Sequence, residues 1–530
     1  MTISYEVIIV GSGPAGVAAA LELRDRNILI LDAGFEAPAP SHDLDQNLYD
    51  LKRDNEDLSE LLLGEQYEGL HNVVSTYLSP KLKSPGVRFV TQDWQQLCPV
   101  DSAGFDGILS FAVGGLSNVW GAGVYRFNDK ELEDFPIRAS DLNPFYDRLT
   151  LEIGVSGCDD DLTSFFGSTQ GLLPPVRLDR LSEGLLEQYS KKKRRLSQIG
   201  LYIGKPRVAL LTKELNERAA YDYNGLEFFK PNGPSIYNSS YTLRELRKRS
   251  NITYCSEFLV EKFEETSAGV TVFAKNIRTK AVEEFVGHKL MLAAGTISTS
   301  KIVLSSFHDD VTRLPLLDNA VSFIPLLAPR FIGAPQENRF FSGVQLNIVY
   351  QKHEDDMPIQ GSFYGVMGLL RSDLLLDLPL SIKGNLTAAK YLAPAMGVLY
   401  LLYPDYSDSN NYLKLTSSGK LEMRYQRKSL GRIERELISA FWRLGYFSLP
   451  SLCKYPAPGN SFHYAGTLPM KANANGKYVT SVNGLLSGTK HVYVVDGANF
   501  SSLPSKNHTF TIMANSMRIA HHMRPELLLS

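Results

Sequence analysis

The hydrophobic and polar positions at the start of the chain form two apolar runs with a helix-forming stretch between them. "YEVIIVG" and "NILILDAG" are continuous apolar runs of the kind that buried parallel strands show. Between them, "PAGVAAALELRD" places strong helix formers behind a proline at the first turn. The order strand, helix, strand predicts a βαβ unit.

Farther along, the pattern predicts strands in "NITYCSEFLVEKFEE", "VTVFAKN" and "HKLMLAAG", then longer strands with hairpin turns over residues 312–455. "NYLKLTSSGKLEMRY" has the turn chemistry of a two-stranded hairpin, and "YLAPAMGVLYLLYP" (391–404) predicts a buried strand pair. The helix "LGRIERELISAFWRL" has apolar residues at helical spacing, which indicates core packing. These residues are Leu430, Ile433, Leu437, Phe441 and Leu444.

The domain organisation follows from these changes in pattern and from a length of 530 residues, which allows two or three domains. We expect an α/β fold in which a Rossmann-like domain is interrupted by a mainly antiparallel β-sheet domain. The first domain comprises 1–311 and 456–530, with helical or loop excursions at 36–95 and 130–205. The second, substrate-binding domain comprises 312–455.

Charge and cysteine content exclude several function classes. With 55 Lys and Arg against 57 Asp and Glu, the net charge of -2 gives no electrostatic reason to expect nucleic acid. The basic run Lys191–Arg195 reads as a solvated helix face. The four cysteines form no CxxC motif, so zinc ribbons and dithiol chemistry are unsupported, no metal site is expected, and a reducing, cytoplasmic compartment fits best. The apolar N-terminal run lacks a basic flank and reads as a strand rather than a signal peptide.

A membrane-spanning helix is not expected, because no window offers about 18 uninterrupted apolar residues. The nearest approach, residues 391–404, is too short and contains an early proline. The surrounding segment 369–404 is rich in leucine and carries Lys383 and Lys390. Contact with a membrane surface through this segment is therefore kept as an alternative.

A glycine motif, G-x-G-x-x-G, occupies the junction between the first strand and the first helix, with Asp32 at the end of the second strand. Its three glycines allow a tight turn, close approach of a pyrophosphate and close packing of helix on strand. The acid would accept hydrogen bonds from ribose hydroxyls, so a bound dinucleotide is expected, although the motif does not separate NAD from FAD. The expected contacts here are Gly11, Gly13, Pro14, Ala15, Gly16, Asp32 and Ala33.

A second glycine cluster lies in "FAVGGLSNVWGAGVYRF" (111–127). A bulge or flexible loop would explain its glycines, and so would close backbone approach to a flat cofactor. The residues alone leave both explanations open.

Seven collinear segments resemble the glucose–methanol–choline (GMC) oxidoreductase family of FAD enzymes. The resemblance covers much of the chain, but the middle domain matches in texture only. The segments are "VIIVGSGPAGVAAALEL", "LILDAG", "VGGLSNVWGAGVYRF", "DFPIRASDLNPFYDRLTLEIGVSG", "LAAGTISTSKIVL", "FHYAGTLPM" and "VYVVDGANFSSLPSKNHTFTIMANSMRIA".

Within the family, "VGGLSNVW" looks most similar to the sugar-oxidising branch that contains pyranose oxidase. Members of that branch often carry a flavin-linked histidine before the Trp, and this chain has Val119 there. The resemblance therefore implies FAD bound without a covalent link through this loop. The further cofactor contacts that it implies are Gly114, Gly115, Ser117, Asn118, Trp120, Gly121, Val260, Ala294, Gly295, Asp496, Gly497, Ala498, Asn507, His508 and Thr509.

The resemblance also implies a catalytic pair. His463 in "HYAGT" matches the family's catalytic histidine, and the spacing to Arg518 puts Asn507 at the position of its partner. His508 falls where many relatives have proline, so we expect it to line the pocket rather than to transfer the proton.

The expected reaction is oxidation of an alcohol, a secondary carbinol of a sugar or glycoside, to a carbonyl. His463 would accept the hydroxyl proton, hydride would pass to flavin N5, and the Asn507 amide would stabilise the developing alkoxide. A non-redox FAD lyase or isomerase on the same fold and a membrane-surface protein are the alternatives. The electron acceptor, whether oxygen, a quinone or a redox protein, and the oligomeric state stay open.

Overall fold

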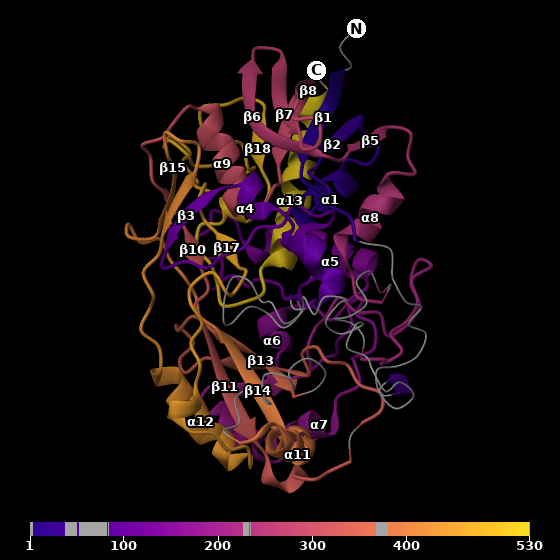
Figure 1. Cartoon of the computed structure of the whole chain (residues 1–530), viewed down its shortest axis with the longest axis vertical. Helices are drawn as coiled ribbons and strands as arrows, with labels where there is room; N and C mark the ends of the chain where they lie inside the picture. Colours follow the sequence, from indigo (N-terminus) through magenta and orange to yellow (C-terminus); the bar gives the residue numbers. More distant parts are fainter. Residues whose placement is uncertain are drawn as a thin grey trace.

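The computed structural model describes residues 4–37, 50–51, 82, 84–225, 233, 235–335, 337–366 and 380–528. Most of the excursion expected at 36–95, and the start of the Leu-rich segment, lie outside these residues. Figure 1 shows one sheet, with β1 and β8, near one end of the long axis and another, with β11 and β14, toward the opposite end.

The βαβ unit of the sequence forms the middle of a seven-stranded sheet. β1 pairs in parallel with β2 and with β8, and β6, β7 and β8 are antiparallel. Val7, Ile8 and Ile9 are fully buried because helices and loops cover both faces of a parallel sheet. In spatial order the strands are β5 (Ile252–Cys255), β2 (Ile28–Leu31), β1 (Ser4–Val10), β8 (Val282–Leu292), β7 (Gly269–Asn276) and β6 (Phe258–Thr266), with β18 (Val492–Val494) on β8.

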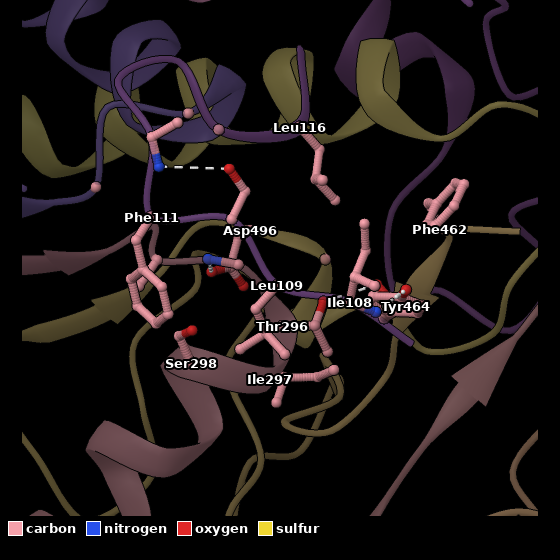
Figure 2. A pocket seen from close by; sticks show the side chains of 18 of the residues that line it. Ile108, Leu109, Phe111, Leu116, Thr296, Ile297, Ser298, Phe462, Tyr464 and Asp496 are labelled. Atoms are coloured by element: carbon pink, nitrogen blue, oxygen red, sulfur yellow. Dashed lines mark hydrogen bonds between the residues drawn. The ribbon is translucent and has the colours of Figure 1, made fainter. Parts of the chain in front are cut away.

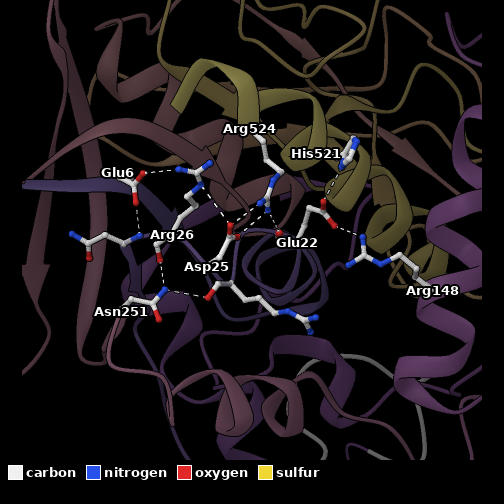
Figure 3. A network of polar contacts seen from close by, with 10 residues as sticks. Glu6, Glu22, Asp25, Arg26, Arg148, Asn251, His521 and Arg524 are labelled. Carbon is white, nitrogen blue, oxygen red and sulfur yellow. Dashed lines mark hydrogen bonds and ion pairs between the residues drawn. The ribbon is translucent and has the colours of Figure 1, made fainter. Parts of the chain in front are cut away.

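The C-terminal helix α13 (Thr509–Met523) returns to the N-terminal unit and packs on α1 (Pro14–Glu22). Beyond its end, Arg524 donates to both carboxylate oxygens of Asp25 at 2.9 and 2.7 Å, and Glu22 receives hydrogen bonds from Arg148 and His521 (Figure 3). The C-terminal helix and the N-terminal unit are thereby packed against each other. Three other helices accompany them: α5 (Ala139–Ile153), α8 (Ser239–Leu246) and α9 (Thr296–Ser306).

A five-stranded antiparallel sheet forms the other end of the molecule. Along β14, Leu399 and Leu401 are buried in the core formed with α7 and α12, whereas Val398 and Tyr400 on the opposite face are half-buried. This alternation places one face against helices and leaves the other for a ligand. The elements are β11 (Val321–Leu327), β14 (Met396–Leu402), β13 (Ile359–Gly365), β12 (Leu346–Tyr350), β4 (Leu201–Gly204), α7 (Arg180–Ser197), α11 (Ile382–Leu392) and α12 (Arg432–Arg443).

The strand pair expected at 391–404 is wrong. Helix α11 continues to residue 392, a 3-10 turn follows, and only 396–402 forms a strand, because the proline at 394 ends the helix. The predicted core stripe of α12 is confirmed, with Leu437, Phe441 and Leu444 at most 2 % exposed. Since β4 precedes residue 312, the sheet also recruits a strand from outside the predicted second domain, and the domain boundaries stay a prediction.

Two small sheets connect the large ones. The hairpin predicted from the sequence is confirmed as β15 (Tyr412–Leu415) and β16 (Leu421–Arg424), and it is flanked by β3 (Val100–Ala103) and β9 (Leu314–Pro315). β10 (Leu317–Asp318) pairs with β17 (Tyr464–Ala465). The short helical turns are α4 (Trp94–Leu97), α6 (Thr163–Phe166), η3 (Pro85–Thr91), η4 (Gly115–Asn118), η5 (Pro329–Phe331), η6 (Ala393–Ala395), η7 (Pro450–Leu452), η8 (Gly497–Asn499) and η9 (Arg524–Leu528).

Candidate active site

A cavity of about 900 Å³ extends from the glycine motif to the five-stranded sheet. This volume lies in the upper part of the range of about 300–1,000 Å³ that small-molecule and cofactor sites occupy. Figure 2 shows Ile108, Leu109, Ile297 and Phe462 lining it together with Asp496. The cavity is therefore large enough for an extended cofactor and a small substrate.

The glycine motif builds one end of this cavity. A Cβ on Gly16 would lie 1.9 Å from the carbonyl oxygen of Gly11, so only glycine permits this packing of α1 on the strand. Around Gly13, by contrast, a Cβ would meet nothing within 4 Å, and this residue lines the cavity. The open space lies at the N-terminus of α1, where backbone amides and the helix dipole favour a phosphate group. These features fit a dinucleotide pyrophosphate.

Asp32 ends β2 at the same part of the cavity and is 8 % exposed. Ser12 donates a hydrogen bond to its carboxylate, and the amide of Gly114 donates to the Ser12 hydroxyl at 3.0 Å. Burial raises the pKa of Asp32 to about 7, because an ionised carboxylate loses hydration there. Tyr254 Oη lies 3.5 Å from the same carboxylate, and a ribose hydroxyl is a further donor from which that carboxylate can accept a hydrogen bond. Ser12 was not singled out from the sequence, although it lies within the motif.

Asp496 organises the opposite side of the cavity. Its carboxylate accepts hydrogen bonds from the amides of Gly295 and Ala498 at 2.9 and 3.0 Å and from the hydroxyl of Thr299 at 2.5 Å. Burial raises its pKa to about 6. The carboxylate thus ties the turn after β8 to the loop after β18, and both loops line the cavity.

The structure brings most of the expected cofactor contacts together. Gly114 and Asn118 lie behind the lining residues and shape the loop: a Cβ on Gly114 would come within 2.6 Å of the Asn238 side chain. Gly16 and Ala498 also lie outside the lining. The expected residues that line the cavity are Gly11, Gly13, Pro14, Ala15, Asp32, Ala33, Gly115, Ser117, Trp120, Gly121, Val260, Ala294, Gly295, Asp496, Gly497, Asn507, His508 and Thr509.

The β10–β17 pair places His463 beside Asn319. Asp318 is paired with Tyr464, so the next residue of one strand lies against the preceding residue of the other. His463 Nδ1 is 2.9 Å from Asn319 Oδ1, and the His463 amide donates to the hydroxyl of Ser461 at 2.9 Å. His463 is 8 % exposed and lines the cavity.

The side-chain amide of Asn319 determines which ring nitrogen of His463 carries the proton. Asn319 Nδ2 donates to the carbonyls of Tyr403 at 2.8 Å and Pro504 at 3.1 Å, which uses the amide's donors and directs Oδ1 to the histidine. An amide oxygen only accepts, so Nδ1 of His463 must be the N–H. The neutral ring therefore keeps its lone pair on Nε2. Asn319 was not found from the sequence, because no motif marks it.

Asn507 and His508 lie at the start of α13 and both line the cavity. The rings of His463 and His508 are 4.6 Å apart, edge to face. Burial lowers the pKa of His508 to about 4, and burial together with His508 lowers the pKa of His463 well below its usual value. Both rings are therefore neutral at neutral pH.

A buried ion pair anchors the loop that carries these residues. Lys506 and Glu131 have side chains that are 1 % and 0 % exposed, and Nζ is 2.5 Å from the carboxylate. Lys506 also donates to the backbone carbonyls of Arg126 at 3.0 Å and Phe165 at 2.6 Å. With every donor used, Lys506 holds the backbone next to Asn507 in one position.

The half-buried face of the five-stranded sheet forms a further wall, called here the aromatic wall. Phe323 and Tyr400 are cross-strand partners with ring centroids 5.2 Å apart, and Tyr364 pairs with Val398 on the next strand. Gly121 belongs to the second glycine cluster (111–127), called here the cofactor loop after its expected role. A Cβ on Gly121 would lie 4.0 Å from the Tyr364 hydroxyl, so this wall faces that loop. Its cavity-lining residues, within the described chain, are Phe323, Ser342, Gly343, Tyr364, Val398 and Tyr400.

The described residues contain no group of three or more His, Cys, Asp or Glu side chains arranged to hold a metal ion. Among the helices that the structure describes, none has both the length and the apolarity needed to cross a bilayer.

Comparisons with known proteins give a match to a family model and a similarity in fold to solved structures. A family model described as GMC oxidoreductase matches residues 452–516, the segment that contains His463 and Asn507. A crystal structure of pyridoxine 4-oxidase from Mesorbium loti is similar in fold, with a TM-score of 0.58 over 98% of this chain and 99% of that chain at 13% identity. A search of curated proteins gave no match. The pyranose oxidase-like branch is not distinguished by these findings. The chain thus contains a segment that matches the GMC oxidoreductase family, and its overall fold is similar to that of pyridoxine 4-oxidase.

Proposed function

We propose that the protein oxidises an alcohol to a carbonyl with His463 as the general base and Asn507 as its partner. The observation that carries this proposal is the hydrogen bond from His463 Nδ1 to Asn319, which leaves Nε2 as the proton acceptor of a ring that lines the cavity. A general base must present a lone pair to the hydroxyl it deprotonates.

The protein's part in the reaction is proton removal and charge stabilisation. His463 Nε2 accepts the hydroxyl proton, and the resulting imidazolium is stabilised by Asn319 Oδ1 at Nδ1. The Asn507 amide donates to the developing alkoxide, as it can at any pH. FAD, when bound, supplies the acceptor for the hydride of the carbinol carbon. His508 packs edge to face on the His463 ring, and together with burial it lowers the pKa of His463.

We propose that FAD binds without a covalent link. Val119 lines the cavity in the cofactor loop, and its side chain offers no nucleophile to the flavin. The pyrophosphate would be held at the glycine motif and the ribose at Asp32. Denaturation in acid tests this point: FAD should be released entirely into the supernatant, and a yellow pellet would contradict it.

The aromatic wall supports an alcohol with a flat, apolar side as the substrate. Phe323, Tyr364 and Tyr400 offer ring faces, and no described residue of this wall is charged. A sugar presents many hydroxyls that need matching polar partners. A sugar or glycoside is the second candidate, supported by the hydroxyls of Ser342 and the two tyrosines and by stacking of a pyranose on the rings.

Stopped-flow measurement of flavin reduction tests the function. Under anaerobic conditions, aromatic alcohols, simple alcohols, sugars and glycosides are mixed with the enzyme in turn. At least one class should bleach the flavin, and His463→Ala should abolish bleaching while FAD stays bound. His508→Ala, a matched change in the adjacent ring, should retain measurable reduction. Persistent reduction in His463→Ala would contradict the assignment of the base, and a lyase or isomerase would leave the flavin oxidised with every alcohol.

A further inference from the structure

Exposed apolar side chains gather at the end of the molecule that is distant from the glycine motif. Thirteen large hydrophobic residues are exposed in the described chain, and nine of them fall between residues 332 and 452: Tyr406 and a group of eight. A soluble surface tolerates scattered apolar residues, but a contiguous group indicates an interaction site. The eight are Ile332, Leu380, Leu386, Tyr391, Trp442, Phe447, Leu449 and Leu452.

Backbone hydrogen bonds join these residues into one region. The amide of Gly333 donates to the carbonyl of Tyr391 at 2.9 Å, which puts Ile332 next to the end of α11. On the other side, Phe447 is bridged to Leu327, one residue before Ala328, whose amide donates to Ala395 just after α11.

Trp442 and Phe447 add a ring pair to this region, with centroids 5.6 Å apart. The Trp442 indole also donates to the carbonyl of Ser448 at 2.9 Å, which holds the ring at the surface next to Leu449. Figure 1 shows α11 and α12 together at the lower end of the long axis. Residues 380–392 and 432–454 therefore belong to one face, called here the α11–α12 face.

The charges on the α11–α12 face are predominantly positive. Segments 380–392 and 432–454 contain six Lys and Arg residues and two Glu residues. Glu434 is buried and accepts a hydrogen bond from Tyr403. Glu436 accepts from Tyr350 and pairs with Arg432, one of the six basic residues, at 3.4 Å. The six basic residues, all exposed, are Lys383, Lys390, Arg432, Arg435, Arg443 and Lys454.

We propose that the α11–α12 face docks onto the surface of a membrane that contains anionic lipids. Trp442, Phe447 and the leucines would enter the boundary between headgroups and acyl chains, where amphipathic aromatic rings are favoured. The lysines and arginines would contact lipid phosphates. A second copy of this chain is a poorer occupant, because a symmetric contact would bring the basic residues of both copies together.

Vesicle co-sedimentation of the full-length flavoenzyme tests the proposal. Two vesicle types are used, phosphatidylcholine alone and phosphatidylcholine mixed with phosphatidylserine. We expect binding to the mixed vesicles that is lost at high salt and is weak on phosphatidylcholine alone. The triple variant Trp442→Ser/Phe447→Ser/Leu449→Ser should bind at least about 10-fold more weakly. A charge variant, Lys383→Glu/Lys390→Glu/Arg443→Glu, should show a loss of similar size.

The matched control replaces two exposed apolar residues elsewhere, Leu151→Ser/Val311→Ser, which are 63% and 80% exposed. This control should bind as the wild type does. All variants should keep their FAD and their rate of flavin reduction, which shows that they fold. Unchanged vesicle binding in the triple variant, or no binding of the wild type to mixed vesicles, would overturn the proposal. A third outcome would also overturn it. If light scattering shows that the wild type is a dimer and the triple variant a monomer, the face binds a second copy of the chain.

Discussion

Replacing Asn319 with Leu tests whether this residue sets the tautomer of the catalytic base. Leucine has a similar shape and size, but it cannot accept the proton of His463 Nδ1, a contact of 2.9 Å in the structure. The ring would then distribute its proton between both nitrogens, and the imidazolium formed during the reaction would lose its buried acceptor. The change should slow flavin reduction while FAD remains bound.

The size of the effect follows from the kind of hydrogen bond that is lost. A hydrogen bond to a charged group contributes about 1.5–3 kcal/mol, and each 1.36 kcal/mol in the barrier is about tenfold in rate. The rate constant of flavin reduction should therefore fall by roughly 10- to 150-fold. Asn319 is fully buried, so the upper part of this range is expected.

The assay is anaerobic stopped-flow reduction across a pH series, with Asn319→Asp as the second variant. A carboxylate at this position would favour protonated His463 and raise its pKa. The acid limb of the rate profile, where the base becomes protonated, should then move to higher pH in Asn319→Asp. A purely structural role would lower the rate without moving this limb.

Two results would refute the reasoning. One is a reduction rate in Asn319→Leu that stays within about twofold of the wild type, since the lost hydrogen bond should cost at least tenfold. The other is an acid limb that has the same position in wild type and Asn319→Asp. Loss of FAD in both variants would instead assign Asn319 to cofactor retention, which the chain's contacts do not support.

Three further predictions concern stability and cofactor binding. Lys506→Met leaves the buried carboxylate of Glu131 without its partner and should lower the free energy of unfolding by about 3–5 kcal/mol, measured by denaturant titration. The control Lys191→Met breaks the exposed pair with Glu187 and should lower it by less than about 1 kcal/mol. Gly16→Ala should abolish FAD binding, measured by flavin absorbance, because its Cβ would lie 1.9 Å from a backbone oxygen; Gly476→Ala, with its nearest neighbour at 3.6 Å, should bind FAD normally. The pKa of His508 is about 4 in the folded protein, against 6.5 for a free imidazole. As the pH drops from 6.5 to 4, the unfolded chain is protonated at this residue before the folded protein is, so the free energy of unfolding falls over this range. His508→Asn should flatten this part of the stability profile, and an unchanged slope would contradict the assignment.

Short-range signals in the sequence were sufficient to predict the βαβ unit and the glycine turn at one end of the cavity. The apolar runs of β1 and β2 and the spacing of Gly11, Gly13 and Gly16 are properties of about 30 consecutive residues, because backbone sterics act locally. The core stripe of α12 and the β15–β16 hairpin follow from the same local periodicity. The roles of His463 and Asn507 came from resemblance to a family and stay a proposal.

Periodicity failed where a segment could satisfy two patterns. Residues 391–404 are apolar enough for two strands, but α11 extends to 392 and only 396–402 joins the sheet. Likewise, β4 joins the antiparallel sheet from a position far earlier in the chain. Short apolar runs do not specify their partners, since the hydrophobic effect has no direction.

The sequence by itself determined the βαβ unit, the glycine turn and the helix stripes, because each depends on neighbours along the chain. Only the tertiary structure decided which groups meet in the cavity. Asn319 contacts a histidine 144 positions away, and the aromatic wall faces a cofactor loop from a different sheet. These contacts depend on how β10 pairs with β17 and on how the two large sheets pack. That pairing is a property of the whole folded chain, which no local pattern encodes.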